Sequence, residues 1–433
     1  MSSVRLVMLA PGHFHAALIQ KQKLPGIDAH THVFAPFDSD LTAHLARVVG
    51  FNTRTEQPTD WTVDVHAGDD WPERFLRDRP GNVAILSGRN RQKIDLMRLA
   101  IEAGMHVLAD KPWIIDIADL PRLHETLGRA AGAGLVVHDI MTERFEITSI
   151  LQKRLVDDLE LFGIIENGDH DNPGVFMESV HYLKKTVAGT PLRRPGWFFD
   201  ITQQGEALSD VGTHLVDQVL WMLFTDEPIN RAADIRMEDA RRWPTVLDRE
   251  QFEAITGLPD FPADLESWIT DGKLEYFCNN QVIFSLRDIS VRLDVLWEVE
   301  AAPGGGDTHN AVFRGTRCSA IIRQAGGKPP ELFVIPNPGQ QQKVRDLLNR
   351  RIEEWQTDYP GLRLVAIGAE FHVMIPDAYR TSHEAHFAEV TAEFLRYVRD
   401  PSLVPAWELP NLLAKYFVTT QGVAEAHLER LEG

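Results

Sequence analysis

The first 140 residues alternate short apolar runs with segments of helical spacing, and this pattern limits the possible folds most strongly. Runs of strand length stand at 4–9, 29–35, 83–86, 105–109 and 135–138, with helical segments at 13–23, 91–104 and 116–131. Strands separated by helices pair in parallel, because each crossover helix returns the chain to the same end of the sheet. The sequence therefore predicts a doubly wound parallel sheet, which binds ligands beyond the carboxyl ends of its strands.

The residues that follow these strands predict a dinucleotide site. Gly12 stands in the middle position of a G-x-G-x-x-G pattern whose outer glycines are missing. Backbone N–H groups at a helix N-terminus still bind pyrophosphate. Asp38, after the second strand, is the acid expected at the ribose hydroxyls, although it could equally be a turn residue. No arginine follows it directly to bind a 2′-phosphate, which slightly favours NAD over NADP. The predicted cofactor-binding residues are Pro11, Gly12, His13, Phe14, Asp38, Ser87, Gly88, Arg89, Asn90, Asp110 and Lys111.

From about residue 150 the pattern becomes that of an antiparallel sheet. Residues 289–299 alternate strictly between apolar and mostly polar side chains, which predicts a half-buried strand. Residues 274–286 suggest a hairpin that turns at Asn279-Asn280. We expect strands at 163–169 and 363–375, an irregular segment at 172–197, surface helices within 230–271, and helices at 341–356, 383–399 and 409–431.

The predicted fold class is therefore α/β followed by α+β. A Rossmann-like doubly wound sheet over residues 1–148 is expected to bind NAD(P). Residues 149–433 are expected to form a substrate and oligomerisation domain with a large, mostly antiparallel open-faced sheet, whose C-terminal helices could pack back on the first domain. An open sheet that is apolar on both faces needs a partner, so we expect a homo-oligomer, either a dimer or a tetramer.

Composition excludes several classes of function. The 433 residues carry a formal net charge of −19, which argues against nucleic acid or an anionic membrane as partner. The two cysteines, Cys278 and Cys318, have no C-x-x-C neighbour, so we expect no disulfide framework and no metal site. The chain has no run of 18 apolar residues and no evident signal peptide. We therefore expect a cytoplasmic protein.

The segment from Gly205 to Trp221 combines a polar stripe with an apolar face. At 100° per residue, one arc of roughly 60° holds Asp210, His214, Asp217 and Trp221. The opposite side carries Val211, Leu215, Val216, Val219, Leu220, Met222 and Leu223. One interpretation is an ordinary amphipathic helix with a solvated polar face and Ser209 or Asp210 as its N-cap. The other is a helix that points two carboxylates and an imidazole into a site.

Taken together, these residues resemble the Gfo/Idh/MocA family of nicotinamide-dependent oxidoreductases. The family's E-K-P motif is similar to Asp110-Lys111-Pro112, and its D-x-G-x-H-x-x-D helix is similar to residues 210–217. Here Asp110 is one methylene shorter than the family's glutamate, and two glycines of the nucleotide turn are lost. These departures concern cofactor specificity more than cofactor binding. The resemblance covers the first 225 residues well, and the sheet domain matches in pattern only.

The resemblance implies that Lys111, Asp210 and His214 carry catalysis. Oxidation of a secondary alcohol removes a hydride from carbon and a proton from oxygen. The unperturbed pKa of histidine, about 6.5, suits His214 as the base. The Lys111 ammonium would stabilise the developing alkoxide, and Asp210 would hold the hydroxyl or orient the imidazole. Asp217 is expected to contact the catalytic residues and not the substrate. The other interpretations are an ion pair of Lys111 with Asp110 and a core position for His214.

Family members act on sugars, inositols and glycosides, so the resemblance implies a carbohydrate or polyol substrate. The predicted substrate-binding residues are Arg144, His181, Lys185, Arg194, Trp197, Asp210 and His214. The expected reaction is NAD(P)-dependent hydride transfer at a ring hydroxyl. A glycosidase or lyase that uses transient oxidation and elimination is a second possibility, and a non-catalytic sugar sensor on the same fold is a third. Net NADH formation would distinguish the first two.

Overall fold

The computed structural model describes residues 3–187 and 190–428. The chain divides into two compact units. The first comprises Met1–Thr142 with Ser382–Leu409, and the second comprises Glu143–Thr381 with Pro410–Gly433. A late segment of the chain therefore belongs to the first unit. The domain boundary predicted at residue 148 stays a prediction.

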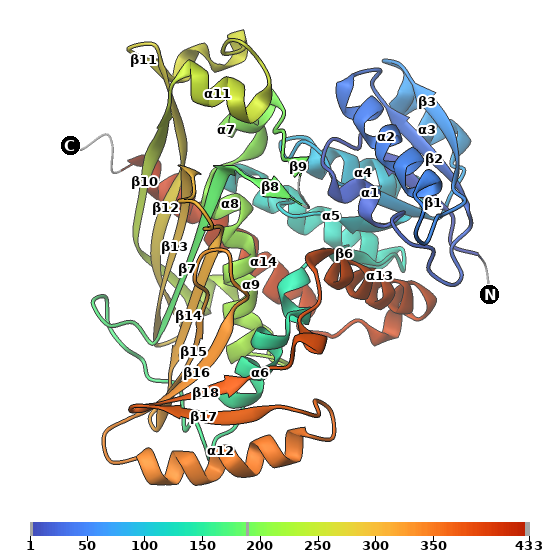
Figure 1. Ribbon diagram of the computed structural model, residues 1–433. Coiled ribbons are helices and arrows are strands. Elements are labelled where there is room, and N and C mark those ends of the chain that lie inside the picture. Colours follow the sequence, from blue (N-terminus) through green and yellow to red (C-terminus); the bar gives the residue numbers. More distant parts are fainter. Residues whose placement is uncertain (1–2, 188–189, 429–433) are drawn as a thin grey trace. The chain divides into compact units, whose positions relative to one another are not determined.

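The first unit contains a six-stranded parallel sheet in the order β3-β2-β1-β4-β5-β6 (Figure 1). Its strands are β1 (Leu6–Leu9), β2 (His30–Ala35), β3 (Thr62–Ala67), β4 (Val83–Leu86), β5 (His106–Ala109) and β6 (Val137–Asp139). The predicted doubly wound parallel sheet is confirmed. The sequence pattern did not reveal β3, because this edge strand is mostly exposed and carries no apolar run.

Short connections join these strands. The helices of the unit are α1 (His15–Leu18), α2 (Ser39–Thr53), α3 (Trp71–Asp78), α4 (Lys93–Glu102), η1 (Ile117–Asp119), α5 (Leu120–Gly132), α13 (His383–Arg399) and η6 (Pro401–Leu403). Helix α1 is only four residues long, so the longer helix predicted over 13–23 is wrong; turns occupy most of 19–23. Helix α13 contacts α1 and β5 with a face that includes Phe387 and Phe394.

The second unit is built on a large mixed sheet in the order β10-β12-β13-β7-β14-β15-β16-β18-β17, with β11 added beside β12 (Figure 1). Its strands are β7 (Val175–Lys184), β10 (Ile235–Leu247), β11 (Ile269–Thr270), β12 (Lys273–Leu286), β13 (Ile289–Glu300), β14 (Thr308–Arg314), β15 (Cys318–Arg323), β16 (Glu331–Pro336), β17 (Arg363–Ile367) and β18 (Glu370–Met374). A separate pair is formed by β8 (Thr186–Val187) and β9 (Thr190–Pro191). All pairs in the large sheet except β13–β7 are antiparallel, which confirms the predicted sheet.

The remaining helices belong to this unit or to its boundary. They are η2 (Thr142–Phe145), α6 (Ile147–Val156), η3 (Gly196–Phe199), α7 (Ile201–Gln204), α8 (Ala207–Asp210), α9 (Gly212–Leu223), α10 (Arg231–Asp234), α11 (Arg249–Thr256), η4 (Ala263–Trp268), α12 (Gln341–Trp355), η5 (Asp377–Tyr379) and α14 (Glu408–Leu428). The helix predicted over 409–431 corresponds to α14, and the end predicted at Leu431 lies outside the described residues.

The predicted hairpin at Asn279-Asn280 is wrong, because both residues lie inside the continuous strand β12. Each asparagine side chain bonds to backbone that a strand alone would leave unpaired. Asn279 Oδ1 accepts from the Trp297 N–H at 2.7 Å, and Asn280 Oδ1 accepts from the Leu208 N–H at 2.9 Å. These tertiary hydrogen bonds override the turn preference of asparagine.

Four other local predictions are also wrong. The segment 172–197 is not irregular throughout, since it contains β7, a central strand of the sheet. Much of 230–271 forms the long strand β10 rather than surface helices alone. Residues 163–169 make only isolated bridges. Residues 363–375 form two strands joined at Gly368, whose φ of +61° suits glycine.

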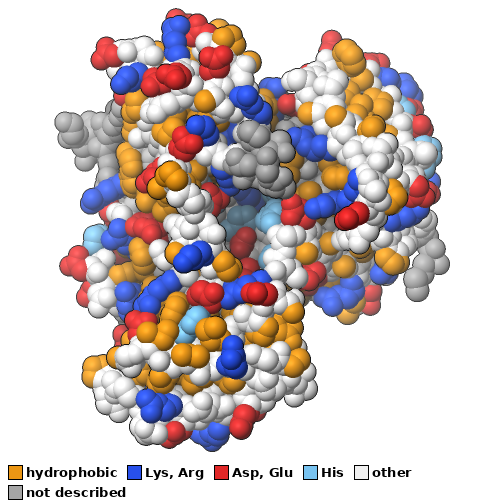
Figure 2. Space-filling model, in the orientation of Figure 1, with side chains coloured by type: hydrophobic (Ala, Val, Ile, Leu, Met, Phe, Trp, Pro, Cys, Tyr) orange, Lys and Arg blue, Asp and Glu red, His pale blue; other side chains and the backbone are white. Residues whose placement is uncertain are grey.

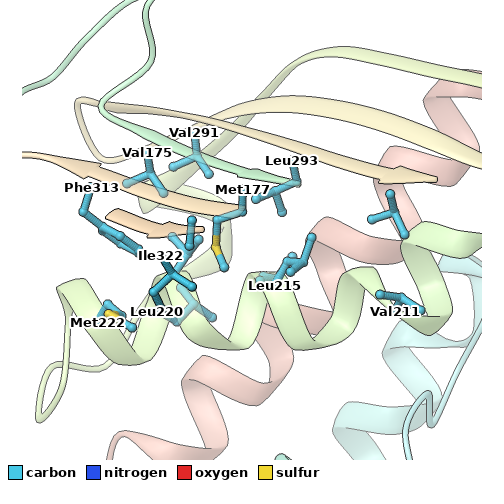
Figure 3. Packing of buried hydrophobic residues seen from close by; sticks show 14 of the residues in the cluster. Val175, Met177, Val211, Leu215, Leu220, Met222, Val291, Leu293, Phe313 and Ile322 are labelled. Carbon is cyan, nitrogen blue, oxygen red and sulfur yellow. The ribbon is translucent and has the colours of Figure 1, made fainter. Parts of the chain in front are cut away.

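The apolar face of α9 packs on the sheet as predicted (Figure 3). Leu215 and Leu220 approach the side chains of Met177, Leu293 and Ile322, which come from three strands. On β13, Val291, Leu293 and Val295 are fully buried in this core as predicted, but Ser290 and Asp294 on the other face are buried too, so the strand is not simply half-buried. The core therefore fixes the axial rotation of α9 and so the direction of its polar stripe.

Charged side chains of both signs lie on the surface, and both cysteines are buried. Acidic and basic side chains are interspersed over the face seen in Figure 2. Cys278 and Cys318 are both buried and free. Among the helices of the described part of the chain, none has the length and apolar character needed to cross a membrane.

Candidate active site

A buried carboxylate stands where β5 ends. Asp110 is 4% exposed, and its Oδ2 lies 3.0 Å from His15 Nδ1 and 3.3 Å from His13 Nδ1. The Ser87 hydroxyl, which follows β4, donates to the same oxygen at 2.9 Å. The other oxygen, Oδ1, is buried and has no hydrogen-bond partner among the described residues. Two predicted cofactor residues, His13 and Ser87, thus converge with His15 on a third, Asp110, and they leave one acceptor unused.

The protonation of this cluster follows from its burial. Desolvation lowers the pKa of His15, although the neighbouring carboxylate opposes that shift. Burial alone would raise the pKa of Asp110, but the two imidazoles hold it well below its usual range. His383 from α13 stacks on His15 with ring centroids 5.0 Å apart, and burial beside that imidazole lowers its pKa to about 4. The cluster therefore pairs one anion with His15 and His383, whose imidazoles both have lowered pKa values.

Lys111 follows Asp110 and precedes a cis peptide bond to Pro112. Its side chain is partly buried, and its charge lowers the pKa of His15. Lys111 therefore lies at the carboxyl end of the sheet beside the Asp110 cluster.

The nucleotide turn is built for close approach of backbone. Ala10 replaces the first glycine of the fingerprint, and its φ of +41° is of the kind glycine adopts readily. A Cβ on Gly88 would lie 2.5 Å from the Ala10 carbonyl oxygen, and one on Gly12 would lie 3.1 Å from Asp40 Oδ2. Glycine at these two positions keeps the ends of β1 and β4 together.

A small pocket opens at the carboxyl ends of β1, β2 and β4, with a volume of about 130 Å³. Its lining includes Pro11, Asp38, Asp40, Leu41, Arg89 and Leu96. Asp38 also caps α2, since its Oδ1 accepts from the Leu41 N–H at 3.0 Å. Arg89 Nε lies 3.5 Å from Asp40 Oδ2. Apolar walls with a few carboxylates and one guanidinium suit an adenosine.

The fit to a dinucleotide is good at this pocket and weaker at the turn itself. The N–H groups of Gly12 and His13 both donate to the Ser87 carbonyl, at 3.0 and 3.1 Å. A pyrophosphate at this turn therefore has to displace that carbonyl or use neighbouring donors. Asn90 is buried and accepts from Lys93 Nζ at 2.7 Å. The predicted contacts of these residues with a cofactor stay predictions.

In the second unit, the predicted helix over 205–221 is interrupted. Helix α8 ends at Asp210, and α9 starts at Gly212, with Val211 between them. The N-cap of α9 is Val211, so the N-cap predicted at Ser209 or Asp210 is wrong. Asp210 Oδ2 accepts from Gln204 Nε2 at 3.1 Å, and the partly buried His214 lies in the first turn of α9. The break places Asp210 and His214 on consecutive turns of one segment.

Asp217 does not belong to a solvated face. It is 3% exposed and accepts from Arg144 through Nε and Nη2, both at 2.7 Å. Lys415 from α14, 1% exposed at its side chain, adds a third contact at 3.0 Å. Burial opposes ionisation, but the two cations hold the pKa of Asp217 far below its usual range. Arg144 is thus engaged in a buried ion triad, and its predicted substrate contact stays a prediction.

Two predicted substrate residues meet on a carboxylate that the sequence pattern did not reveal. Asp307 Oδ2 accepts from Lys185 Nζ at 2.6 Å and lies 3.2 Å from His181 Nδ1. Although burial opposes ionisation, His181 and Lys185 hold the pKa of Asp307 far below its usual range. The side chain of Asp307 is only 29% exposed. It follows a glycine-rich loop, where its neighbours in sequence give no sign of this contact.

Arg194 lies in aromatic surroundings. Its guanidinium carbon is 4.8 Å from the Trp297 ring centroid and 4.5 Å from that of Phe198. Burial lowers its pKa, while Tyr276 and Asp210 act in the opposite direction. Trp197 lies in η3 and packs on the core. Arg194 therefore lies near Asp210, whereas Trp197 is partly structural.

The comparisons with known proteins fit this arrangement. A family model described as "Putative oxidoreductase C terminal domain" matches residues 151–427. The crystal structure of an oxidoreductase from Parabacteroides merdae is 39% identical, covering 99% of this chain and 98% of that one with a TM-score of 0.96. The chain therefore belongs to this oxidoreductase family. The predicted Gfo/Idh/MocA type and the predicted enzyme class are confirmed.

More distant structures share the fold. KijD10, a 3-ketoreductase from Actinomadura kijaniata solved with NADP and TDP-benzene, is 14% identical, covering 96% of each chain with a TM-score of 0.57. GenD2 from gentamicin A biosynthesis, solved with NAD, is 15% identical, covering 99% of this chain and 95% of that one, with the same TM-score. No curated protein matches the chain.

Proposed function

We propose that this protein is an NAD(P)-dependent dehydrogenase that transfers hydride between the nicotinamide and a ring hydroxyl of a sugar, polyol or glycoside. The observation that carries the proposal is the pocket at the carboxyl ends of β1, β2 and β4, on the same edge of the sheet as Lys111. Ligands of doubly wound sheets bind at this edge. Two distant neighbours with the same fold contain NADP or NAD.

The nicotinamide would accept or supply the hydride when bound. The protein residues would handle the proton and orient the alcohol. In this proposal His214 takes the proton from the hydroxyl oxygen, and Lys111 holds its ammonium against the charge that develops there. Asp210, fixed by the Gln204 amide, orients the hydroxyl or the imidazole. These three groups come from both units, so the proposal requires them to meet at one substrate.

The polar groups of the second unit support a carbohydrate as substrate. Asp307 with His181 and Lys185 offers both donors and acceptors, and Arg194 beside Trp297 combines a cation with an aromatic ring. Sugars require several directed hydrogen bonds and an apolar platform. Asp38 and Asp40 at the pocket favour NAD over NADP, because two carboxylates repel a 2′-phosphate.

The test uses the full chain and a panel of polyols and glycosides with NAD⁺ and NADP⁺, read at 340 nm. We expect NADH formation with at least one sugar, lost on Lys111→Ala and kept in the matched surface control Lys273→Ala. Sugar release with a flat signal at 340 nm would instead identify a hydrolase that oxidises its substrate only transiently. Dinucleotide binding without turnover, unchanged by Lys111→Ala, would contradict catalysis and support a sensor.

Two further parts of the proposal concern assembly and location. The large sheet of the second unit supports a homodimer or tetramer, which a light-scattering mass of one chain would contradict. On β13, the side chains that alternate with the core residues include Ser290, Arg292 and Asp294, so this face is not uniformly apolar. A cytoplasmic location is part of the same proposal.

A further inference from the structure

Three imidazoles and a carboxylate stand together on one face of β2 and β3, apart from the candidate active site. The two strands are parallel, with His32 paired to Asp64 and Phe34 paired to His66. Because side chains two residues apart share a face, His30, His32, Asp64 and His66 all project from the same side. Neither the family membership nor the proposed dehydrogenase chemistry explains this group.

The distances within the group approach those of a metal-ligand set. Asp64 Oδ2 lies 3.0 Å from His30 Nε2 and 3.8 Å from His32 Nδ1, and all three atoms lie within 4.8 Å of one another. His66 Nε2 lies 3.5 Å from His32 Nδ1. Ligand atoms bound at about 2.0–2.2 Å in a tetrahedron stand roughly 3.4 Å apart. Small side-chain rotations would therefore bring these donors around one ion.

The backbone and one aromatic contact already hold the donors in place. The strand pairing fixes the Cα positions, so chelation orders only the side-chain rotamers. The His66 ring stacks on the fully buried Phe34, with centroids 4.1 Å apart and planes 5° from parallel. His30 and Asp64 are half exposed, which leaves a path for an ion.

We propose that His30, His32 and Asp64, with His66 as an adjoining fourth donor, bind one divalent transition-metal ion of the Zn²⁺ type. Imidazole nitrogen with a single carboxylate suits Zn²⁺, Co²⁺, Ni²⁺ or Cu²⁺ and disfavours Ca²⁺ and Mg²⁺. The pocket of the proposed cofactor begins at Ala35, the last residue of β2. His30 and His32 precede that residue by five and three positions, roughly 16 and 10 Å along an extended strand, and His66 is paired with Phe34, so all these donors project from the face opposite to Ala35. The ion would therefore tie β3 to β2 and stabilise the fold without taking part in the reaction.

The test is metal titration of the tag-free full chain after removal of metals with a chelator. We expect one Co²⁺ per chain with a micromolar or lower Kd, a visible ligand-field spectrum, displacement by Zn²⁺, and a higher Tm with Zn²⁺. The variant His30→Gln with His32→Gln should weaken binding by at least 100-fold and abolish the Tm rise. His124→Gln, an exposed histidine in α5, is the matched control and should behave as the unaltered protein.

The metal titration also distinguishes the proposed site from a second cluster of possible ligands. The donor atoms of His13, His15 and Asp110 also lie within 4.8 Å of one another. Binding that survives the double variant and disappears in His13→Gln would move the ion to that cluster and overturn the proposal. Millimolar or non-saturating binding would overturn it as well. Circular dichroism establishes that each variant is folded, and none of these readouts depends on dehydrogenase activity.

Discussion

Asp110 in the first unit and Asp217 in the second are both buried carboxylates beside basic side chains, and the two are held in different ways. Asp217 accepts from Arg144 and Lys415, both permanently charged, and both of its oxygens are used. Asp110 faces two imidazoles and a hydroxyl, and one of its oxygens has no partner among the described residues. The Arg144 and Lys415 cations keep the Asp217 carboxylate ionised, whereas imidazoles and a hydroxyl, as at Asp110, can exchange one hydrogen-bond partner for another. The comparison assigns Asp217 to structure and Asp110 to ligand binding.

The largest loss of stability is expected when the ion triad of Asp217, Arg144 and Lys415 is broken. Asp217→Ala removes the carboxylate that Arg144 and Lys415 share, and breaking such a buried ion pair typically costs about 3–5 kcal/mol of unfolding free energy. Urea denaturation at pH 7 measures the loss. The exposed Asp171→Ala in the same unit is the control and should change stability little. Equal stability of the two variants would contradict the structural role of Asp217.

The second largest effect distinguishes a role of Lys111 in the reaction from a role in stability. Lys111→Met removes the ammonium but keeps most of the apolar stem, so we expect kcat/KM to fall by about 10²–10³ with little change in Tm. The assay is NADH formation with the best substrate of the panel. A large loss of Tm together with activity would place Lys111 with Asp217 among the structural charges.

Acid sensitivity should reveal a buried histidine of the first unit. His44 in α2 is 1% exposed, neither of its ring nitrogens has a partner among the described residues, and burial lowers its pKa to about 4. An unfolded histidine titrates near 6.5, so the unfolded chain takes up the proton first as the pH falls. The stability of the first unit should be complete above pH 6.5 and decline by about 3 kcal/mol towards pH 4. His44→Leu should flatten that slope in urea titrations, and an unchanged slope would exclude His44 as its source.

The smallest effect concerns the hydroxyl beside Asp110. Ser87→Ala removes one donor from Oδ2 but leaves both imidazoles, so about 1 kcal/mol of stability should be lost. Because the same carboxylate is a predicted cofactor-binding residue, the Kd for NAD⁺ should change more than the Tm does. Isothermal titration measures both binding and its enthalpy. A change in Tm alone would make the Asp110 cluster purely structural.

The sequence predicted the parts of the fold that local patterns encode. Buried strands such as β4 and the alternating strand β13 have periodicities that depend on their own residues. The strands β3, β7 and β10 were missed, because they carry polar or mixed side chains and are strands only through their neighbours. The turn predicted at Asn279-Asn280 failed for the same reason, since distant backbone groups satisfy those amides.

In the candidate site, too, some residues could be found from local sequence patterns, and others only from contacts between distant parts of the chain. The motifs at Lys111 and at Asp210–His214 could be found because the chemistry needs those residue types at short spacing. Asp307, Asp40 and the unpartnered oxygen of Asp110 could not be found, because their importance depends on contacts across long sequence separations. The motif spacing did identify Asp217, but it did not reveal the ion pairs with Arg144 and Lys415, which lie 73 and 198 residues away.

The central claim is that Lys111 from the first unit and His214 from the second act on one substrate oxygen. A crystal structure of the protein with bound NAD⁺ and a non-reactive sugar analogue tests it most directly. The account predicts that Lys111 Nζ and a ring nitrogen of His214 both lie within about 2.6–3.2 Å of the same ligand oxygen. A complex in which the two groups lie more than about 10 Å apart, beyond any single bridging water, would contradict it.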